Sequence, residues 1–221
     1  MSRNIAIDGP AGAGKSTIAR MLAGQLNYIY VDTGAMYRAM ALYMTEENVD
    51  VTDPDAVAEA CENIKIDIQY SNGAQQVILN GCNVNDKIRT EEISRMSSRI
   101  SALPVVRGKL LSLQRSLAAS ADVIMDGRDI GTNVLPNADV KIYLTAGTHV
   151  RALRRYKEQT EKGINCRLED IEQEIILRDE RDMNREIAPL RQAEDAVRVD
   201  TSDMTIDEVV CYLHQLISRA V

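Results

Sequence analysis

The chain has 221 residues, of which 26 are Lys or Arg and 33 are Asp or Glu, so the formal net charge is −7. Such an acidic balance argues against a broad surface for nucleic acid or for an anionic membrane, and any anionic ligand must be held by a local cationic pocket. The length allows one sizeable core with small inserted units. The sequence contains no run of 18 or more apolar residues, so it predicts no membrane-spanning helix.

The four cysteines, at positions 61, 82, 166 and 211, are widely scattered and form no C-x-x-C pair. This spacing favours reduced thiols in a cytoplasmic protein over a metal site or a disulfide framework. A glycine-rich motif begins at residue 9, which leaves no room upstream of it for a cleavable signal peptide. Because we find no heptad pattern and no apolar edge, we expect a monomer.

The first predicted element is a strand at 4–8, and it leads directly into Gly9-Pro10-Ala11-Gly12-Ala13-Gly14-Lys15-Ser16-Thr17. This segment fits G-x-x-x-x-G-K-[ST], and an amphipathic helical pattern follows it. In such a loop, main-chain N–H groups surround the phosphates of a nucleoside triphosphate, and the positive end of the helix points at them. Lys15 would reach the outer phosphates, and the Ser16 hydroxyl would bind Mg²⁺ directly. The motif predicts binding of ATP or GTP.

Further β-rich runs alternate with helical stretches, at 28–32, 123–126, 140–144 and 197–200. Strands that alternate with helices predict an α/β fold, in which helices cover both faces of a parallel sheet. Several of these runs end in Asp. Since open α/β sheets bind their ligands at the carboxyl edge, these aspartates predict a polar crevice there.

Two regions depart from this alternation. Residues 64–85 alternate apolar and polar side chains around turn signals at 71–73 and 80–81, which predicts a small antiparallel hairpin or three-stranded insert with no catalytic residue. Residues 148–191 are rich in Arg, Glu and Asp and poor in apolar residues, which predicts amphipathic helices with a highly charged face.

The second strand is followed by Asp32-Thr33-Gly34-Ala35-Met36-Tyr37-Arg38. Thr33 or Asp32 can cap the helix that begins here. Tyr37 and Arg38 then fall in its first two turns, where an aromatic ring and a guanidinium would suit a flat base and an anion. A capped helix with an incidental Arg is the simpler alternative.

The third strand is followed by Asp126-Gly127-Arg128-Asp129-Ile130-Gly131-Thr132. Asp126 ends an apolar strand, which is where a carboxylate orients Mg²⁺ through water in proteins with this phosphate loop. Arg128 and Asp129 can form a plain structural salt bridge. Their position beside a phosphate loop favours a ligand instead, because buried charges are costly unless something compensates them.

A regular charge array follows at Arg178, Arg181, Asp182 and Arg185. The spacing predicts Arg178, Asp182 and Arg185 on one helical face, with Arg181 beside it. Intrahelical ion pairs on a solvated face are one explanation. The other is that these cations neutralise the charge of a phosphoryl group in transit. A second cluster, Arg151, Arg154 and Arg155, fits equally a mobile lid over the triphosphate or an ordinary exposed helix.

These four motifs, in this order, resemble those of bacterial cytidylate kinases, and the resemblance covers essentially the whole chain. It implies a nucleoside-monophosphate kinase with a five-stranded parallel sheet. The core would comprise 1–32, 103–150 and 169–221, and the monophosphate-binding domain about 33–102, with the β insert at 64–85. The lid would lie at about 150–168.

The resemblance also implies roles for individual residues. Thr33, Tyr37 and Arg38 would form the first contact segment for CMP, with Arg38 on its phosphate. Ser98, Arg107 and Asp129 would read the cytosine. Arg128 and Arg185 would hold the acceptor phosphate, and Arg178 and Asp182 the sugar. The implied reaction is ATP-dependent phosphorylation of CMP and of dCMP, with Mg²⁺ as the cofactor, held by Ser16 directly and by Asp126 through water.

Two other functions remain open from the residues. One is a different small-molecule kinase on the same scaffold, of the adenylate, uridylate or shikimate type, against which the 126–132 segment and the β insert argue. The other is a GTPase switch or a non-catalytic nucleotide sensor. A GTPase would carry D-x-x-G and N-K-x-D, and neither string occurs in this chain.

Overall fold

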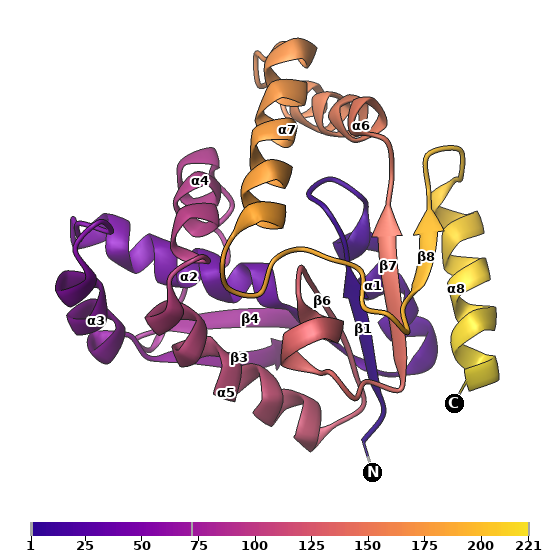
Figure 1. Ribbon diagram of the computed structural model, residues 1–221, viewed down its shortest axis with the longest axis horizontal. Coiled ribbons are helices and arrows are strands. Elements are labelled where there is room, and N and C mark those ends of the chain that lie inside the picture. The colour runs from indigo at the N-terminus through magenta and orange to yellow at the C-terminus, as the bar shows by residue number, and fades with distance from the viewer. Residues whose placement is uncertain (1, 72, 221) are drawn as a thin grey trace.

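The computed structural model describes residues 2–71 and 73–220, and its centre is a five-stranded parallel sheet (Figure 1). The strand order is β2-β6-β1-β7-β8. The strands are β1 (Asn4–Asp8), β2 (Ile29–Asp32), β6 (Val123–Gly127), β7 (Val140–Thr145) and β8 (Val197–Asp200). All five expected strands are present, each within one residue of its predicted bounds, and the predicted parallel sheet is confirmed.

Helices cover both faces of this sheet, because alternate residues of each buried strand point to opposite sides. Ile5 and Ile7 of β1 belong to the apolar cluster packed with α1 (Lys15–Leu26) and α8 (Ile206–Ala220). Ala6, between them, belongs to a second cluster on the other face. That cluster packs with α2 (Thr33–Glu46), α3 (Pro54–Asn63) and α5 (Pro104–Ser120). Two cores therefore hold the central strands in place.

The predicted β insert is a three-stranded antiparallel sheet of β3 (Ile66–Ser71), β4 (Ala74–Leu79) and β5 (Cys82–Asn83). Asn80 and Gly81 both adopt positive φ, as a tight hairpin turn between β4 and β5 requires. The other predicted turn contains Asn72, which lies outside the described residues. Helix α4 (Glu91–Ile100) follows the insert and packs against α2.

The charged region forms two helices, α6 (Thr148–Glu161) and α7 (Leu168–Asn184), which Figure 1 shows beyond the carboxyl ends of β1 and β7. They share a small apolar cluster of Ala152, Ile171 and Ile175. A short helical turn, η1 (Ile130–Val134), follows β6. Within the described part of the chain, no helix is both long and apolar enough to cross a membrane.

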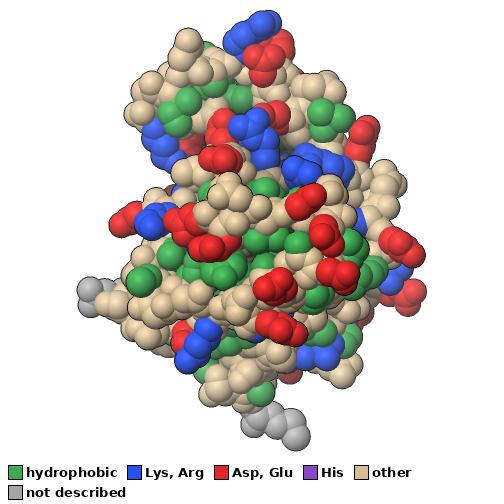
Figure 2. All heavy atoms as spheres, turned by 90° about the vertical axis from the view of Figure 1, so that its left-hand side faces the viewer, with side chains coloured by type: hydrophobic (Ala, Val, Ile, Leu, Met, Phe, Trp, Pro, Cys, Tyr) green, Lys and Arg blue, Asp and Glu red, His purple; other side chains and the backbone are tan. Residues whose placement is uncertain are grey.

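Figure 2 shows acidic and basic side chains mixed over one face of the molecule, on the side of α3 and α4. The basic groups on this side do not form a continuous surface.

Candidate active site

A cleft of about 730 Å³ lies at the carboxyl edge of the parallel sheet, where the strand-ending aspartates predicted a crevice. It is lined by residues from the 9–17 loop, from the segments after β2 and β6, and from α4, α5 and α7. The sequence-predicted residues that line it are Ala11, Gly12, Gly14, Lys15, Ser16, Thr17, Thr33, Tyr37, Arg38, Ser98, Arg107, Asp126, Arg128, Asp129, Arg178, Asp182 and Arg185. Gly9, Pro10 and Ala13 are buried and do not line it.

The glycine-rich loop needs residues without a side chain at its tightest points. Gly9 has φ +150°, and a Cβ there would lie 1.9 Å from the main-chain oxygen of Leu144. Gly14, at φ 85°, precedes α1 and offers no side-chain cap to its first N–H groups. Unfilled donors at a helix N-terminus form a binding site for an anion such as a phosphate.

Lys15 is buried beside this loop, and its ammonium donates to the main-chain oxygen of Pro10 at 2.7 Å. Burial, together with the nearby charge of Arg128, holds the pKa of Lys15 well below its usual value. The carboxylates of Asp126 and Asp8 oppose these two effects only in part, and an anion in the cleft would add further negative charge beside Lys15.

The Asp126 carboxylate is held by two hydroxyl groups. The Ser16 hydroxyl donates to it at 2.8 Å, and that of Tyr30 donates at 3.0 Å. Burial, and then the charge of Asp32, raise the pKa of Asp126 to about 6. A hard divalent cation suits a hydroxyl and a carboxylate at such a position. Among the described residues no three His, Cys, Asp or Glu side chains form a metal group, so a cation here would need substrate and water oxygens as well.

Asp32 provides the cap of α2, accepting from the N–H of Ala35 at 2.8 Å. Thr33, the alternative cap, instead donates to the main-chain oxygen of Asp126 at 2.7 Å. Asp32 also pairs with Arg38 at 3.1 Å. The segments after β2 and β6 are thus joined at the floor of the cleft.

The β insert supports this floor, a role that the sequence did not suggest. The Gln75 side chain of β4 accepts from the main-chain N–H of Asp32 at 2.8 Å and donates to its main-chain oxygen at 3.2 Å. The Tyr70 hydroxyl of β3 donates to the main-chain oxygen of Tyr30. The sequence around Gln75, a polar and half-exposed strand, does not predict such a contact, because the two sheets that it joins are far apart in the chain.

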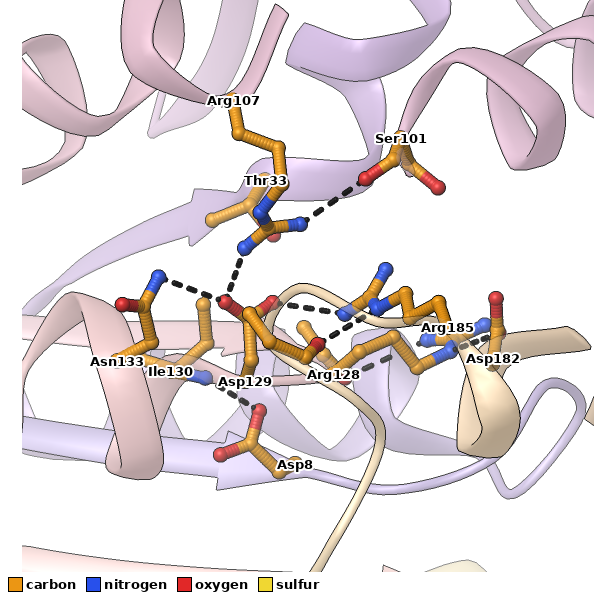
Figure 3. Close-up of polar contacts among 12 residues, drawn as sticks. Asp8, Thr33, Ser101, Arg107, Arg128, Asp129, Ile130, Asn133, Asp182 and Arg185 are labelled. Carbon is orange, nitrogen blue, oxygen red and sulfur yellow. Dashed lines mark hydrogen bonds and ion pairs between the residues drawn. The ribbon is translucent and has the colours of Figure 1, made fainter. Parts of the chain in front are cut away.

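Asp129 lies at the centre of a polar cluster (Figure 3). One carboxylate oxygen pairs with Arg107 and accepts from the Asn133 amide at 3.1 Å, and the other pairs with Arg185 at 3.2 Å. Arg107 also donates to the main-chain oxygen of Ser101 and lies over the Tyr37 ring. The structure therefore places two cations and a carboxylate, all buried, along one wall of the cleft.

Arg128 and Asp182 join the β6 turn to α7 through a contact of 2.9 Å. Burial opposes ionisation of Asp182, but the charges of Arg128 and Arg178 outweigh it and lower its pKa. Burial and then Arg128 lower the pKa of Arg178 to about 10, and the buried Nε of Arg178 has no hydrogen-bond partner. Ser98 likewise has a buried hydroxyl without a partner. Both unpartnered groups line the cleft.

The expectation that Arg185 shares a helical face with Arg178 and Asp182 is wrong. Helix α7 ends at Asn184, and Arg185 has extended backbone with ψ 141°. Its guanidinium donates to the main-chain oxygen of Ala188, so the following loop directs it back toward Asp129. Arg181 is exposed and donates to Leu177 of its own helix.

Arg151 is buried, which contradicts the alternative of an ordinary exposed helix at this end of α6. Its guanidinium donates to the main-chain oxygens of Ala11 and Ala146 and pairs with Asp179 at 2.7 Å. Arg154 donates to the main-chain oxygen of Thr201. Arg155 has only long contacts to carboxylates, of 3.8 and 3.9 Å. Spacing alone could not separate these three environments.

Some polar residues that support the site had no role expected from the sequence, among them Asp8, Gln75, Asn133 and Asp179. Only Asp8 left a signal, as a carboxylate at the end of a buried strand. The others lie in ordinary polar contexts, and their partners are brought close only by the fold.

Comparisons with known proteins agree with one another. The family model described as "Cytidylate kinase" matches residues 5–219. A cytidylate kinase of Lactobacillus johnsonii is 50% identical over 97% of this chain and 94% of its own length. One of Carboxydothermus hydrogenoformans is 47% identical over 97% of both chains. A gluconokinase structure from Sinorhizobium meliloti, 14% identical, matches with a TM-score of 0.50 over 98% of this chain and 92% of its own, and supports the fold alone.

Proposed function

Because this chain belongs to the cytidylate kinase family, we propose that it transfers the γ-phosphoryl group of ATP to CMP, and also to dCMP. The products are ADP and CDP or dCDP, within pyrimidine nucleotide metabolism. The observation that carries this proposal is the pairing of a phosphate loop with the buried Arg107–Asp129–Arg185 cluster across one cleft. The loop would bind the donor triphosphate, and the cluster would bind the acceptor nucleotide.

The cluster suits cytosine by its hydrogen-bonding pattern. Cytosine has an amino donor at C4 and acceptors at N3 and O2, whereas uracil has an acceptor at C4. Asp129 would accept from the amino group, while Arg107 and the Ser98 hydroxyl would serve the remaining base edge. With uracil, the carboxylate would face a carbonyl, and a mismatched buried polar group costs a factor on the order of 10² or more in discrimination.

The remaining cleft residues suit the phosphate and sugar of the acceptor. Arg38, Arg128 and Arg185 would bind the phosphate, and Arg178 with Asp182 would bind the ribose. Thr33 and Tyr37 complete this wall. The unpartnered Nε of Arg178 supports its contact with the acceptor, since an oxygen of the bound nucleotide could accept from it.

The donor triphosphate would lie in the 9–17 loop, with Lys15 on its outer phosphates. We propose that Ser16 holds Mg²⁺ directly and Asp126 holds it through water, because they offer a hydroxyl and a carboxylate beside the loop. Bound there, the ion would supply neutralisation of phosphate charge.

Phosphoryl transfer needs no general base from this chain. The bond between the γ-phosphorus and the bridging oxygen breaks, a new bond forms to an oxygen of the acceptor phosphate, and ADP leaves with the electron pair. The acceptor oxygen is already anionic. The protein therefore contributes alignment of the two phosphates and cationic stabilisation, from Lys15, Arg128, Arg178 and Arg185.

We further propose that about 33–102 forms the monophosphate-binding domain and about 150–168 the lid, within one P-loop kinase domain of 221 residues. The core would be 1–32, 103–150 and 169–221. Closure of the lid would exclude water, which otherwise competes as the acceptor. We propose a cytoplasmic monomer without nucleic-acid or membrane partners. The four unpaired cysteines and the acidic net charge support that setting.

The test is an ADP-release assay with ATP and Mg²⁺ in which CMP, dCMP, UMP and AMP are offered separately as acceptors. We expect ADP production to depend on the acceptor, with CMP and dCMP far above UMP and AMP. Preference for AMP or UMP would indicate another kinase on this scaffold. ADP production independent of any acceptor, or none at all, would indicate a nucleotide sensor and overturn the proposal.

A further inference from the structure

Asp8 connects the two substrate regions of the cleft, although it does not line the cleft itself. It is the last residue of β1 and directly precedes Gly9, the first residue of the phosphate loop. Its buried carboxylate accepts from the main-chain N–H of Ile130 at 2.8 Å and from that of Gly131 at 2.7 Å. Figure 3 shows Asp8 directed at this turn from the side opposite Arg107.

The turn that Asp8 holds is the one that presents Asp129. The two N–H groups belong to η1, which begins immediately after Asp129. Neighbouring atoms leave this turn little freedom. A Cβ at Gly127 would lie 2.7 Å from the Ile130 side chain, and one at Gly131 would lie 3.1 Å from Lys141 and 3.4 Å from the Asp8 carboxylate.

The Asp8 contact is unusual for a purely structural one because it buries a charge-bearing group. Burial raises the pKa of Asp8 to about 6, and the N–H groups of Gly131 and Ile130 only partly oppose this effect. A neutral side chain would avoid the cost of burying a carboxylate. Two converging oxygens on one rigid side chain, however, fix two consecutive N–H groups at once, and hydrogen bonds to a charged group are stronger than neutral ones.

From this geometry we propose that Asp8 is a positioning residue for base recognition. By holding Ile130 and Gly131, it sets the place of the Asp129 carboxylate between Arg107 and Arg185, and thereby the discrimination between cytosine and uracil. The inference rests on the proposed function, in which Asp129 reads the base. In this way β1, the strand that leads into the phosphate loop for ATP, also contributes to selection of the acceptor nucleotide.

The experiment compares Asp8→Asn with the unaltered protein by the ratio of kcat/KM for CMP to that for UMP. In Asp8→Asn, one amide N–H₂ would face a main-chain N–H, so the turn must shift. A misplacement of about 1 Å can cost on the order of 10²-fold at a reacting or reading group. We expect the ratio to fall by roughly tenfold or more, with KM for ATP changed by less than about threefold.

This ratio separates positioning from other effects of the substitution. Any change in ATP binding or turnover that follows from loss of the Asp8 charge near Lys15 is common to both acceptors and cancels in the ratio. A loss of stability alone also cancels. An unchanged ratio in folded Asp8→Asn protein would overturn the inference, while acceptor-independent behaviour of the unaltered protein would overturn the proposed function instead.

Asp139→Asn is the matched control. Its carboxylate also accepts from a main-chain N–H across the sheet, that of Asn4 at 2.7 Å, but at the opposite end of β1. We expect its CMP:UMP ratio to equal that of the unaltered protein. An equal fall in both variants would show a general effect of the sheet and would contradict the inference.

Asp8→Ser is the second variant, because its side chain is shorter and its rotatable hydroxyl need not point a donor at the two N–H groups, so the contact is removed with less strain. We expect the same direction of change in the ratio. If neither Asp8 variant folds, while Asp139→Asn does, Asp8 is a structural residue only and the inference fails.

Discussion

The Arg151 guanidinium donates a hydrogen bond of 2.9 Å to the main-chain oxygen of Ala11, 140 residues earlier in the chain. The same side chain pairs with Asp179 of α7 at 2.7 Å, and both groups are buried. Arg151 thus joins the phosphate loop to the helix that carries Arg178 and Asp182. Because these contacts are with groups of the protein itself, we infer that Arg151 stabilises the folded site.

Arg151→Ala should lower the free energy of unfolding by roughly 3–5 kcal/mol, because it leaves Asp179 buried without its partner. Denaturant unfolding measures this loss. In the double variant Arg151→Met with Asp179→Leu, both charges are gone, and most of the stability should return. Arg155→Ala, which removes only long contacts, is the control and should change stability little. A large loss in that control would contradict this account.

Lys15→Ala should leave a folded protein with much lower turnover. The ammonium contacts one carbonyl in the loop, and its charge is needed only when phosphate is present. We expect kcat to fall by roughly 10²–10³-fold, as for removal of one preorganised donor. Steady-state kinetics with CMP measures the fall, and thermal unfolding verifies the fold. Near-normal turnover would refute the role of Lys15.

Asp129→Ala should reduce the preference for CMP over UMP. Without the carboxylate, nothing accepts from the cytosine amino group and nothing opposes the uracil carbonyl. We expect the ratio of the two kcat/KM values to fall by roughly 10². Asn133→Ala, which removes one partner of Asp129 and keeps its charge, should have a smaller effect. Equal losses for both acceptors in Asp129→Ala would mean that Asp129 does not read the base.

Arg178→Met should preserve or raise the melting temperature of the protein without ligand. Burial and repulsion from Arg128 make the Arg178 charge unfavourable until an anion is bound, as its lowered pKa indicates. The rise in melting temperature caused by CMP should shrink in this variant, because the anion no longer relieves that repulsion. Arg128→Met is the comparison: it removes the partner of Asp182 and should lower the melting temperature. A lower melting temperature for Arg178→Met than for Arg128→Met would contradict this explanation.

The stabilising contribution of Asp8 should depend on pH. Its pKa in the folded protein, about 6, lies above the ordinary 3.8, so the folded state binds the proton more tightly. The contribution is therefore complete below about pH 4 and is lost as the pH rises through 6. Asp8→Ser should be more destabilising at pH 4.5 than at pH 7.5, measured as a difference in unfolding free energy. A difference that does not vary with pH, or grows with it, would contradict the assignment.

The sequence by itself determined the elements and the order of the motifs. Short β-rich runs between helical patterns located all five strands of the parallel sheet, and alternation with tight turns located the insert. The 9–17 loop was recognisable because its chemistry is local: glycines, a lysine and a hydroxyl must follow one another at fixed spacing. The aspartates at the strand ends predicted the position of the crevice, because they too are recognised from neighbouring residues in the sequence.

Only the tertiary structure decided which charges meet. Asp129 faces Arg107 and Arg185, Arg151 binds Ala11, and Gln75 holds Asp32, all across many residues. Helical spacing misplaced Arg185 because it could not show that α7 ends one residue before it. Side-chain partners depend on how the sheet, the insert and the α6–α7 pair approach one another. That approach is set by packing of the whole chain, whereas strand and loop patterns are set by neighbouring residues.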